Sequence, residues 1–127
     1  MNFKMSWTLD GTGGNKQSSS WDAILNQLKQ LQGKEGSLTL DMLNGEYNMA
    51  DMLQVRTENG YYLITLGEIC EDEYQVRTYW DSTEPDAAMM ILGDHWPKRQ
   101  LTRDFELIIR VFKEFFDTGN VSTKLLS

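Results

Sequence analysis

Cysteine and histidine are scarce in this chain of 127 residues, which contains one of each, Cys70 and His95. A single thiol cannot form an internal disulfide, which excludes a secreted scaffold held by disulfides and favours a reducing compartment. The usual zinc sites need several Cys or His ligands, so we expect neither a metal nor a cofactor. Catalysis would require His95 to act with Cys70 or with the adjacent Asp94, and we expect no enzyme here.

Long apolar runs and basic residues are also in short supply. No run approaches the roughly 20 residues of a membrane span, and the first ten residues lack the apolar centre and cleavage site of a secretory signal. We therefore expect a cytoplasmic protein. Twelve basic residues against 19 acidic ones give a net charge of −7, which argues against nucleic acid and anionic lipid as partners.

The composition that remains is typical of one globular domain. Hydrophobic residues make up 40% of the chain and charged residues 24%, and a chain of this length can bury a sizeable core. We find no internal repeat and no linker that would divide the chain. A single domain over residues 1–127 is therefore predicted.

The first third of the chain predicts a strand, a loop and a helix. Apolar and polar residues alternate over residues 2–9, as in a half-buried strand. The glycine-rich residues 11–17 match no phosphate-binding motif and predict a flexible loop. Helical spacing follows from about residue 20 to residue 32, with Ser19 as the predicted N-cap and Gly33 as the stop.

The middle of the chain changes from helical spacing to alternation. Asn44-Gly45 and Asn59-Gly60 are turn signals, and the second predicts a type I′ hairpin with positive φ at both positions. Strands are predicted at residues 37–42, 52–58, 61–69, 74–80 and 87–92.

The last third predicts a second helix with a broad apolar face. Thr102 is its predicted N-cap and Asp104 lies in its first turn. Residues 117–120 close the helix, and the tail 121–127 either adds an edge strand or frays. The fold class is therefore predicted to be α+β. Short links between successive strands favour an antiparallel meander of about five to six strands, with two amphipathic helices packed on one face.

The acidic excess is concentrated in one window of the sequence. Residues 66–94 contain eight acidic side chains and one basic side chain, Arg77, whereas acids and bases balance over the rest of the chain. Such a window either keeps a face solvated or attracts a basic protein partner. Tyr74 and Trp80 are predicted to face the core, which makes Tyr79 the better contact residue. The candidate partner-binding residues are Glu71, Asp72, Glu73, Tyr79, Asp81, Glu84 and Asp86.

The C-terminal third resembles a known family. It contains a strand at residues 74–80, Gly93, Trp96-Pro97, a helix that opens at residues 101–106, and the closing run 115–120. These features, with a Trp-containing first strand, are similar to small α+β immunity proteins of bacterial polymorphic and contact-dependent growth-inhibition toxin systems. The resemblance implies an antitoxin that binds and neutralises a cognate nuclease or deaminase toxin domain and has no active site of its own. The alternative is a small acidic adaptor or scaffold domain that binds another protein, for which a dimer is also allowed.

Overall fold

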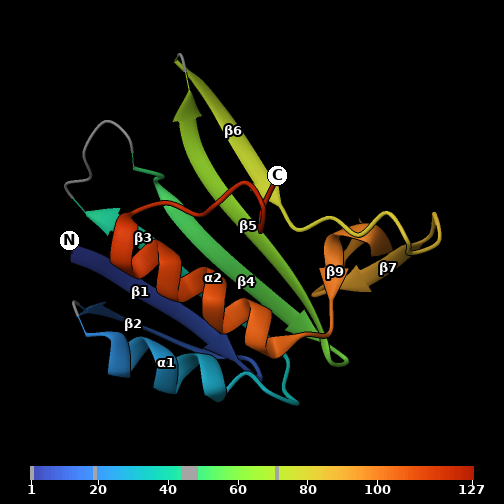
Figure 1. Cartoon of the computed structure of the whole chain (residues 1–127). Coiled ribbons are helices and arrows are strands. Elements are labelled where there is room, and N and C mark those ends of the chain that lie inside the picture. The colour runs from blue at the N-terminus through green and yellow to red at the C-terminus, as the bar shows by residue number, and fades with distance from the viewer. Residues whose placement is uncertain (1, 19, 44–48, 71) are drawn as a thin grey trace.

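The structure is a computed structural model that describes residues 2–18, 20–43, 49–70 and 72–127 (Figure 1). The predicted turn at Asn44-Gly45 and the candidate residue Glu71 lie outside these ranges. The elements are β1 (Asn2–Leu9), β2 (Thr12–Ser18), α1 (Trp21–Lys29), β3 (Gly36–Leu43), β4 (Met52–Glu58), β5 (Tyr61–Cys70), β6 (Glu73–Thr78), β7 (Ala88–Ile91), β8 (Asp94–Pro97), a 3-10 turn (Lys98–Gln100), β9 (Leu101–Thr102) and α2 (Phe105–Thr118).

The main sheet has the strand order β2-β1-β3-β4-β5-β6, with β9 added beside β5, and all neighbours are antiparallel. The predicted α+β class and antiparallel sheet are confirmed. Strands β3 to β6 form a meander, but β1 lies between β2 and β3. Because both of these strands are antiparallel to β1, they run parallel to each other. Parallel strands need a crossover, and α1 provides it.

Strand β2 replaces the flexible loop that we predicted at residues 11–17. The turn is made by Asp10 and Gly11, whose φ angles are 47° and 87°. Gly14 pairs with Trp7, and a Cβ on Gly14 would lie 2.6 Å from the Trp7 indole. The glycine therefore makes room for a cross-strand aromatic ring, and the segment is a paired strand rather than the loop that its glycine content indicated.

The core lies on one face of the sheet. Alternate residues of β1, β3, β4 and β5 are buried there, and they form one cluster with buried residues of both α1 and α2. Phe3 of β1 contacts Phe115 of α2 at 5.4 Å between ring centroids, and Trp21 of α1 contacts Phe116 of α2 at 5.8 Å. In Figure 1, α2 is drawn in front of the strands, and α1 lies beside β2 at the edge of the sheet.

Both predicted N-caps are off by one or two residues. Ser20, rather than Ser19, accepts a hydrogen bond from the backbone N–H of Ala23 and begins α1. Asp104, rather than Thr102, accepts from the N–H of Leu107 and begins α2. Thr102 is buried in β9 instead, because tertiary pairing with β5 takes that residue out of the helix start.

Residues 88–97 form a separate hairpin rather than a last strand of the sheet. We predicted one strand at 87–92 and a connection to the helix, but β7 pairs with β8 through a turn at Leu92 and Gly93, both with positive φ. Ile91 packs with Leu63 and Leu101 in a small second cluster. Leu63 lies between core residues of β5, so its side chain points to the opposite face of the sheet. Because Ile91 packs on Leu63, the β7–β8 hairpin covers part of that opposite face.

The C-terminal tail is anchored to the edge of the sheet. Leu126 is fully buried, and the backbone N–H and C=O of Ser127 both bond to Thr78 at the end of β6. Arg77 donates to the carbonyls of Val121 and Leu126 and to the side chain of Asn120. The tail therefore neither frays nor forms a further strand, since side-chain contacts and the single backbone pairing of Ser127 with Thr78 hold it.

Candidate functional site

Strand β6 divides the predicted acidic patch into two groups. Asp72 and Glu73 are exposed at the tip of the β5–β6 hairpin, whereas Tyr79 and Asp81 follow the other end of β6. At about 3.3 Å per residue, Glu73 and Tyr79 are roughly 20 Å apart. The single patch that the sequence predicted is therefore two surfaces. Glu71 belongs to the tip in sequence but lies outside the described residues.

The second group lines a hollow of about 320 Å³. Three predicted site residues, Tyr79, Asp81 and Glu84, contribute to it, while Asp86 lines a separate hollow with His95 and Trp96. The whole lining consists of Tyr61, Tyr79, Asp81, Glu84, Leu101, Thr102, Arg103 and Asp104. The site is thus assembled from the loop after β6, the start of β5, and the segment that leads into α2.

Hydrogen bonds hold the acidic loop in place. The Asp81 carboxylate accepts from the N–H of Thr83 at 3.0 Å and from its hydroxyl at 2.6 Å, and these bonds lower the pKa of Asp81. The Asp81 N–H donates to the carbonyl of Arg99 at 2.7 Å, and Arg99 Nε donates to the carbonyl of Glu84 at 3.0 Å. The carboxylates are therefore presented by an ordered loop, which reduces the entropy lost on binding.

The electrostatic potential in the hollow is negative. Burial raises the pKa of the half-buried Tyr79, and the charges of Asp81, Asp104 and Glu84 raise it further, against a hydrogen bond with Thr102 that lowers it. Each of these carboxylates disfavours a second negative charge at the phenol. The same field favours a positive charge that enters the hollow.

One basic side chain in the lining is already engaged. The Arg103 guanidinium lies 5.0 Å from the centre of the Tyr61 ring, and Lys98 lies 5.9 Å from the same ring. Both distances are within the range of cation–π attraction. The lining thus contains three carboxylates and one guanidinium, and that guanidinium stacks on Tyr61. The hollow therefore carries a net negative charge.

The structure corrects the prediction for two aromatic residues. Tyr74 and Trp80, which we expected in the core, are 58% and 50% exposed. Tyr79, expected on the opposite and more accessible face, packs against the core and is half-buried. The predicted alternation is present, but the face of β6 that meets the core cluster is the one that carries Tyr79, not the one that carries Tyr74 and Trp80.

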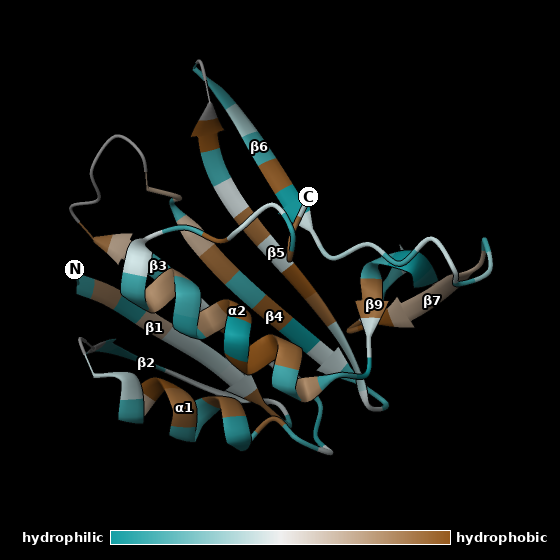
Figure 2. Cartoon of the chain, in the orientation of Figure 1, coloured by the Kyte–Doolittle hydropathy of each residue, from teal (hydrophilic) through white to brown (hydrophobic). Residues whose placement is uncertain are grey.

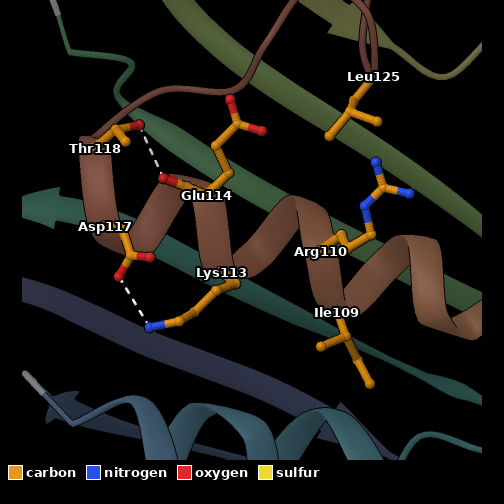
Figure 3. A pocket seen from close by; sticks show the side chains of 7 residues that line it. All are labelled: Ile109, Arg110, Lys113, Glu114, Asp117, Thr118 and Leu125. Carbon is orange, nitrogen blue, oxygen red and sulfur yellow. Dashed lines mark hydrogen bonds and ion pairs between the residues drawn. The ribbon is translucent and has the colours of Figure 1, made fainter.

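A larger hollow of about 400 Å³ lies on the outer side of α2 (Figure 3). Its lining is Ile109, Arg110, Lys113, Glu114, Asp117, Thr118 and Leu125. Lys113 bonds to Asp117 at 3.0 Å, and the Glu114 carboxylate accepts from the N–H of Ser122 at 2.7 Å. Because these charges are used within the protein, the hollow holding Tyr79 is the better candidate site.

Of the two catalytic combinations that the sequence left open, the structure bears on His95 with Cys70. The β7–β8 hairpin bonds through Leu92 to Glu58, at the Tyr61 end of β5. Cys70 lies at the other end of β5, roughly 30 Å along the strand. His95 and Cys70 are therefore not brought together. Among the described residues, no group of three or more Cys, His, Asp or Glu could hold a metal ion, and no helix is long and apolar enough to cross a membrane.

Comparison with known proteins identifies the family. A sequence model for a family of unknown function, DUF6911, matches residues 3–125. The chain belongs to DUF6911. A crystal structure of a hypothetical protein from Neisseria gonorrhoeae is similar to this DUF6911 chain, with a TM-score of 0.77 and 20% sequence identity over 96% of this chain and 92% of the other. That similarity shows a shared fold. Among curated proteins, none matches significantly.

Several residues of the candidate site in this DUF6911 chain were not predicted from its sequence. Tyr61, Arg103 and Asp104 come from segments that are distant in sequence from the acidic window. For Asp104 the sequence predicted a role at the start of the helix, and its second role in the lining of the hollow was not predicted. No pattern within residues 66–94 could have found these residues, because they join the acidic window only through tertiary contacts. The pairing of β9 with β5 places Arg103 near Tyr61, and the bonds of Arg99 to Asp81 and Glu84 tie the acidic loop to the same segment.

The raised pKa of Tyr79 predicts a specific dependence of stability on pH. The unfolded chain ionises Tyr79 near the ordinary tyrosine pKa of about 10, below the folded value, so the free energy of unfolding falls as pH rises above 10. Tyr79→Phe should reduce this fall. Urea unfolding of both proteins at several alkaline pH values measures it. Tyr74→Phe is the control, and equal pH dependence of wild type and Tyr79→Phe would contradict the field that we describe.

Proposed function

We propose that this chain is an immunity protein that binds a cognate toxin domain in the cytoplasm and places an acidic hollow against a basic surface of that toxin. The observation that supports this most is the convergence of Asp81, Glu84 and Asp104 around the half-buried Tyr79. The hollow has room for a lysine or arginine side chain. A nuclease or deaminase domain presents such side chains because its substrate is a polyanion.

The charge of the hollow supports a role in partner capture. Acidic residues gathered in a concave site focus the electric field and accelerate encounter with a basic partner, and they also discriminate against acidic proteins. Tyr79 adds an aromatic surface, and tyrosine is among the residues that often dominate binding energy. We further take both helices to cover one face of the sheet, which leaves the acidic loop accessible beyond the end of β6.

Co-expression tests the proposed function. The partner to use is the C-terminal domain of a large protein encoded directly upstream of this gene. We expect this chain to restore growth of cells that express that domain, and the two purified proteins to form a stable complex. An adaptor domain would bind its partner without protecting growth. Absence of both protection and complex formation, or a gene with no such neighbour, would contradict the immunity proposal.

A charge reversal in the hollow should slow association with the toxin domain. We expect Glu84→Lys to lower the association rate constant by about tenfold at low salt, and the difference should shrink as salt is added. Glu106→Lys makes the same change at an exposed position in the first turn of α2 and is the matched control. Stopped-flow kinetics measures both variants. An equal effect of the two would show that net charge acts, rather than the hollow.

A further inference from the structure

The outer edge of β6 is oriented to accept another strand. Thr78 exchanges both backbone hydrogen bonds with Ser127, so its N–H and C=O point away from β5. Because this orientation repeats every second residue, the N–H and C=O groups of Val76 and Tyr74 also point outward. The hydrogen bonds of β5 support this orientation. The carbonyl of Gly67, which pairs with Val76, accepts from the N–H of Asp51 on the side of β5 away from β6.

This edge is open over Tyr74 and Val76. Within residues 2–18, 20–43, 49–70 and 72–127, β6 pairs with β5 alone, and the tail reaches only Thr78. Proteins usually protect such an edge by covering it, bulging it or placing charges on it, because an unpaired strand recruits other strands. The bond between Thr78 and Ser127 shows that the same edge already accepts a backbone partner from this chain.

Apolar side chains accompany the open edge. Ile69, Tyr74 and Val76 are 62%, 58% and 57% exposed, and they lie on the same face of the β5–β6 hairpin because Ile69 pairs with Tyr74. Figure 2 shows hydrophobic colour at the far end of β5 and one hydrophobic band within the otherwise hydrophilic β6. Tyr74 extends across β5, where a Cβ on Gly67 would collide with its hydroxyl. This face would pack alternate side chains of an added strand.

The charge beside the edge is negative. Asp72 and Glu73 are exposed at the hairpin tip. The basic residue of β6, Arg77, is only 13% exposed and is already used by Glu68 at 3.5 Å and by the tail. A second copy of this chain would bring a second acidic tip to the edge. The Arg77 of that second copy would not balance the charge, since its guanidinium is already bonded to Glu68 and to the tail.

We propose that the edge of β6 binds an extended segment of a partner protein that alternates apolar and basic residues, by adding it to the sheet as a new strand. Backbone bonds to Tyr74 and Val76 would provide affinity, and basic side chains near Asp72 and Glu73 would provide selectivity. The inference deepens the proposed binding function, because it assigns to the toxin domain, or to another basic partner, a second contact away from the hollow.

A short synthetic peptide that alternates valine with lysine tests the proposal on the full chain. At millimolar peptide, we expect the exchange of the Tyr74 and Val76 amide hydrogens to slow about tenfold by NMR. Two control peptides should give no protection: one is N-methylated at the amides that would face β6, and the other has glutamate in place of lysine. Equal protection by either control, or none with the valine–lysine peptide, would overturn the proposal.

Val76→Pro supplies the matched variant. It removes an N–H that points away from β5, so the β5–β6 ladder keeps its bonds, and proline is tolerated at such edge positions. We expect the variant to keep the native unfolding midpoint and to lose peptide binding at least tenfold. Unchanged binding would overturn the proposal, as would protection of the same amides by self-association without peptide. Glu84→Lys should leave peptide binding unchanged, which separates a failure of the edge from a failure of the hollow.

Discussion

Arg77→Ala is expected to lower the free energy of unfolding by about 3–4 kcal/mol, because it removes the anchor of the C-terminal tail. Its guanidinium donates to the carbonyls of Val121 and Leu126 and to the side chain of Asn120, and it pairs with Glu68. Hydrogen bonds from a charged donor contribute about 1.5–3 kcal/mol, and the acceptors left behind in a partly buried site are costly.

Urea unfolding measures this loss, with Arg110→Ala as the control. Arg110 is an exposed arginine on α2, and its removal should change stability by less than about 0.5 kcal/mol. Arg77→Lys keeps the charge but not the planar fork that reaches several acceptors, so it should recover only a small part of the loss. An Arg77→Ala protein as stable as wild type would show that the tail is held by the burial of Leu126 alone.

Phe115→Ala should cost about 3–5 kcal/mol, which is a large share of the roughly 5–15 kcal/mol that holds a typical domain together. Phe115 is fully buried, and its ring lies 5.4 Å from that of Phe3. The truncation leaves a cavity between α2 and β1 at the centre of the core. The lost contacts join two elements from opposite ends of the chain.

The same urea experiment compares Phe115→Ala with Ile109→Ala. Ile109 is a half-buried residue of α2 that faces the outer hollow, and its truncation should cost about 1–2 kcal/mol. The m-value should be unchanged in both variants if the surface exposed on unfolding is the same. Equal losses at the two positions would contradict the assignment of Phe115 to the centre of the core.

Local patterns predicted those elements in which the side chains themselves set the backbone. Residues 52–58 form β4 as expected, and Asn59-Gly60 forms a hairpin turn with φ angles of 54° and 78°. Asn-Gly favours that turn in any context, because both residues tolerate positive φ. The apolar face of α2 was predicted for a similar local reason, since it repeats at helical spacing through Phe112 and Phe115.

Predictions failed where long-range pairing decides the structure. Residues 12–18 contain no apolar alternation, and they form β2 because β1 supplies a partner edge and Trp7 covers Gly14. Residues 94–97 form β8 because β7 and the Ile91 cluster hold them. The candidate site was predicted in part for the same reason: Tyr79, Asp81 and Glu84 lie together, but Asp104 and Tyr61 join them only through the fold.

The sequence by itself determined the acidic balance of this protein, its α+β class and the window that contains the whole excess of charge. Only the tertiary structure decided that β6 separates this charge into a tip and a hollow, and that Tyr74 and Val76 face solvent at an open edge. The physical reason is that alternation along a strand defines two faces but not which of them is covered. That depends on where the helices and the C-terminal tail pack.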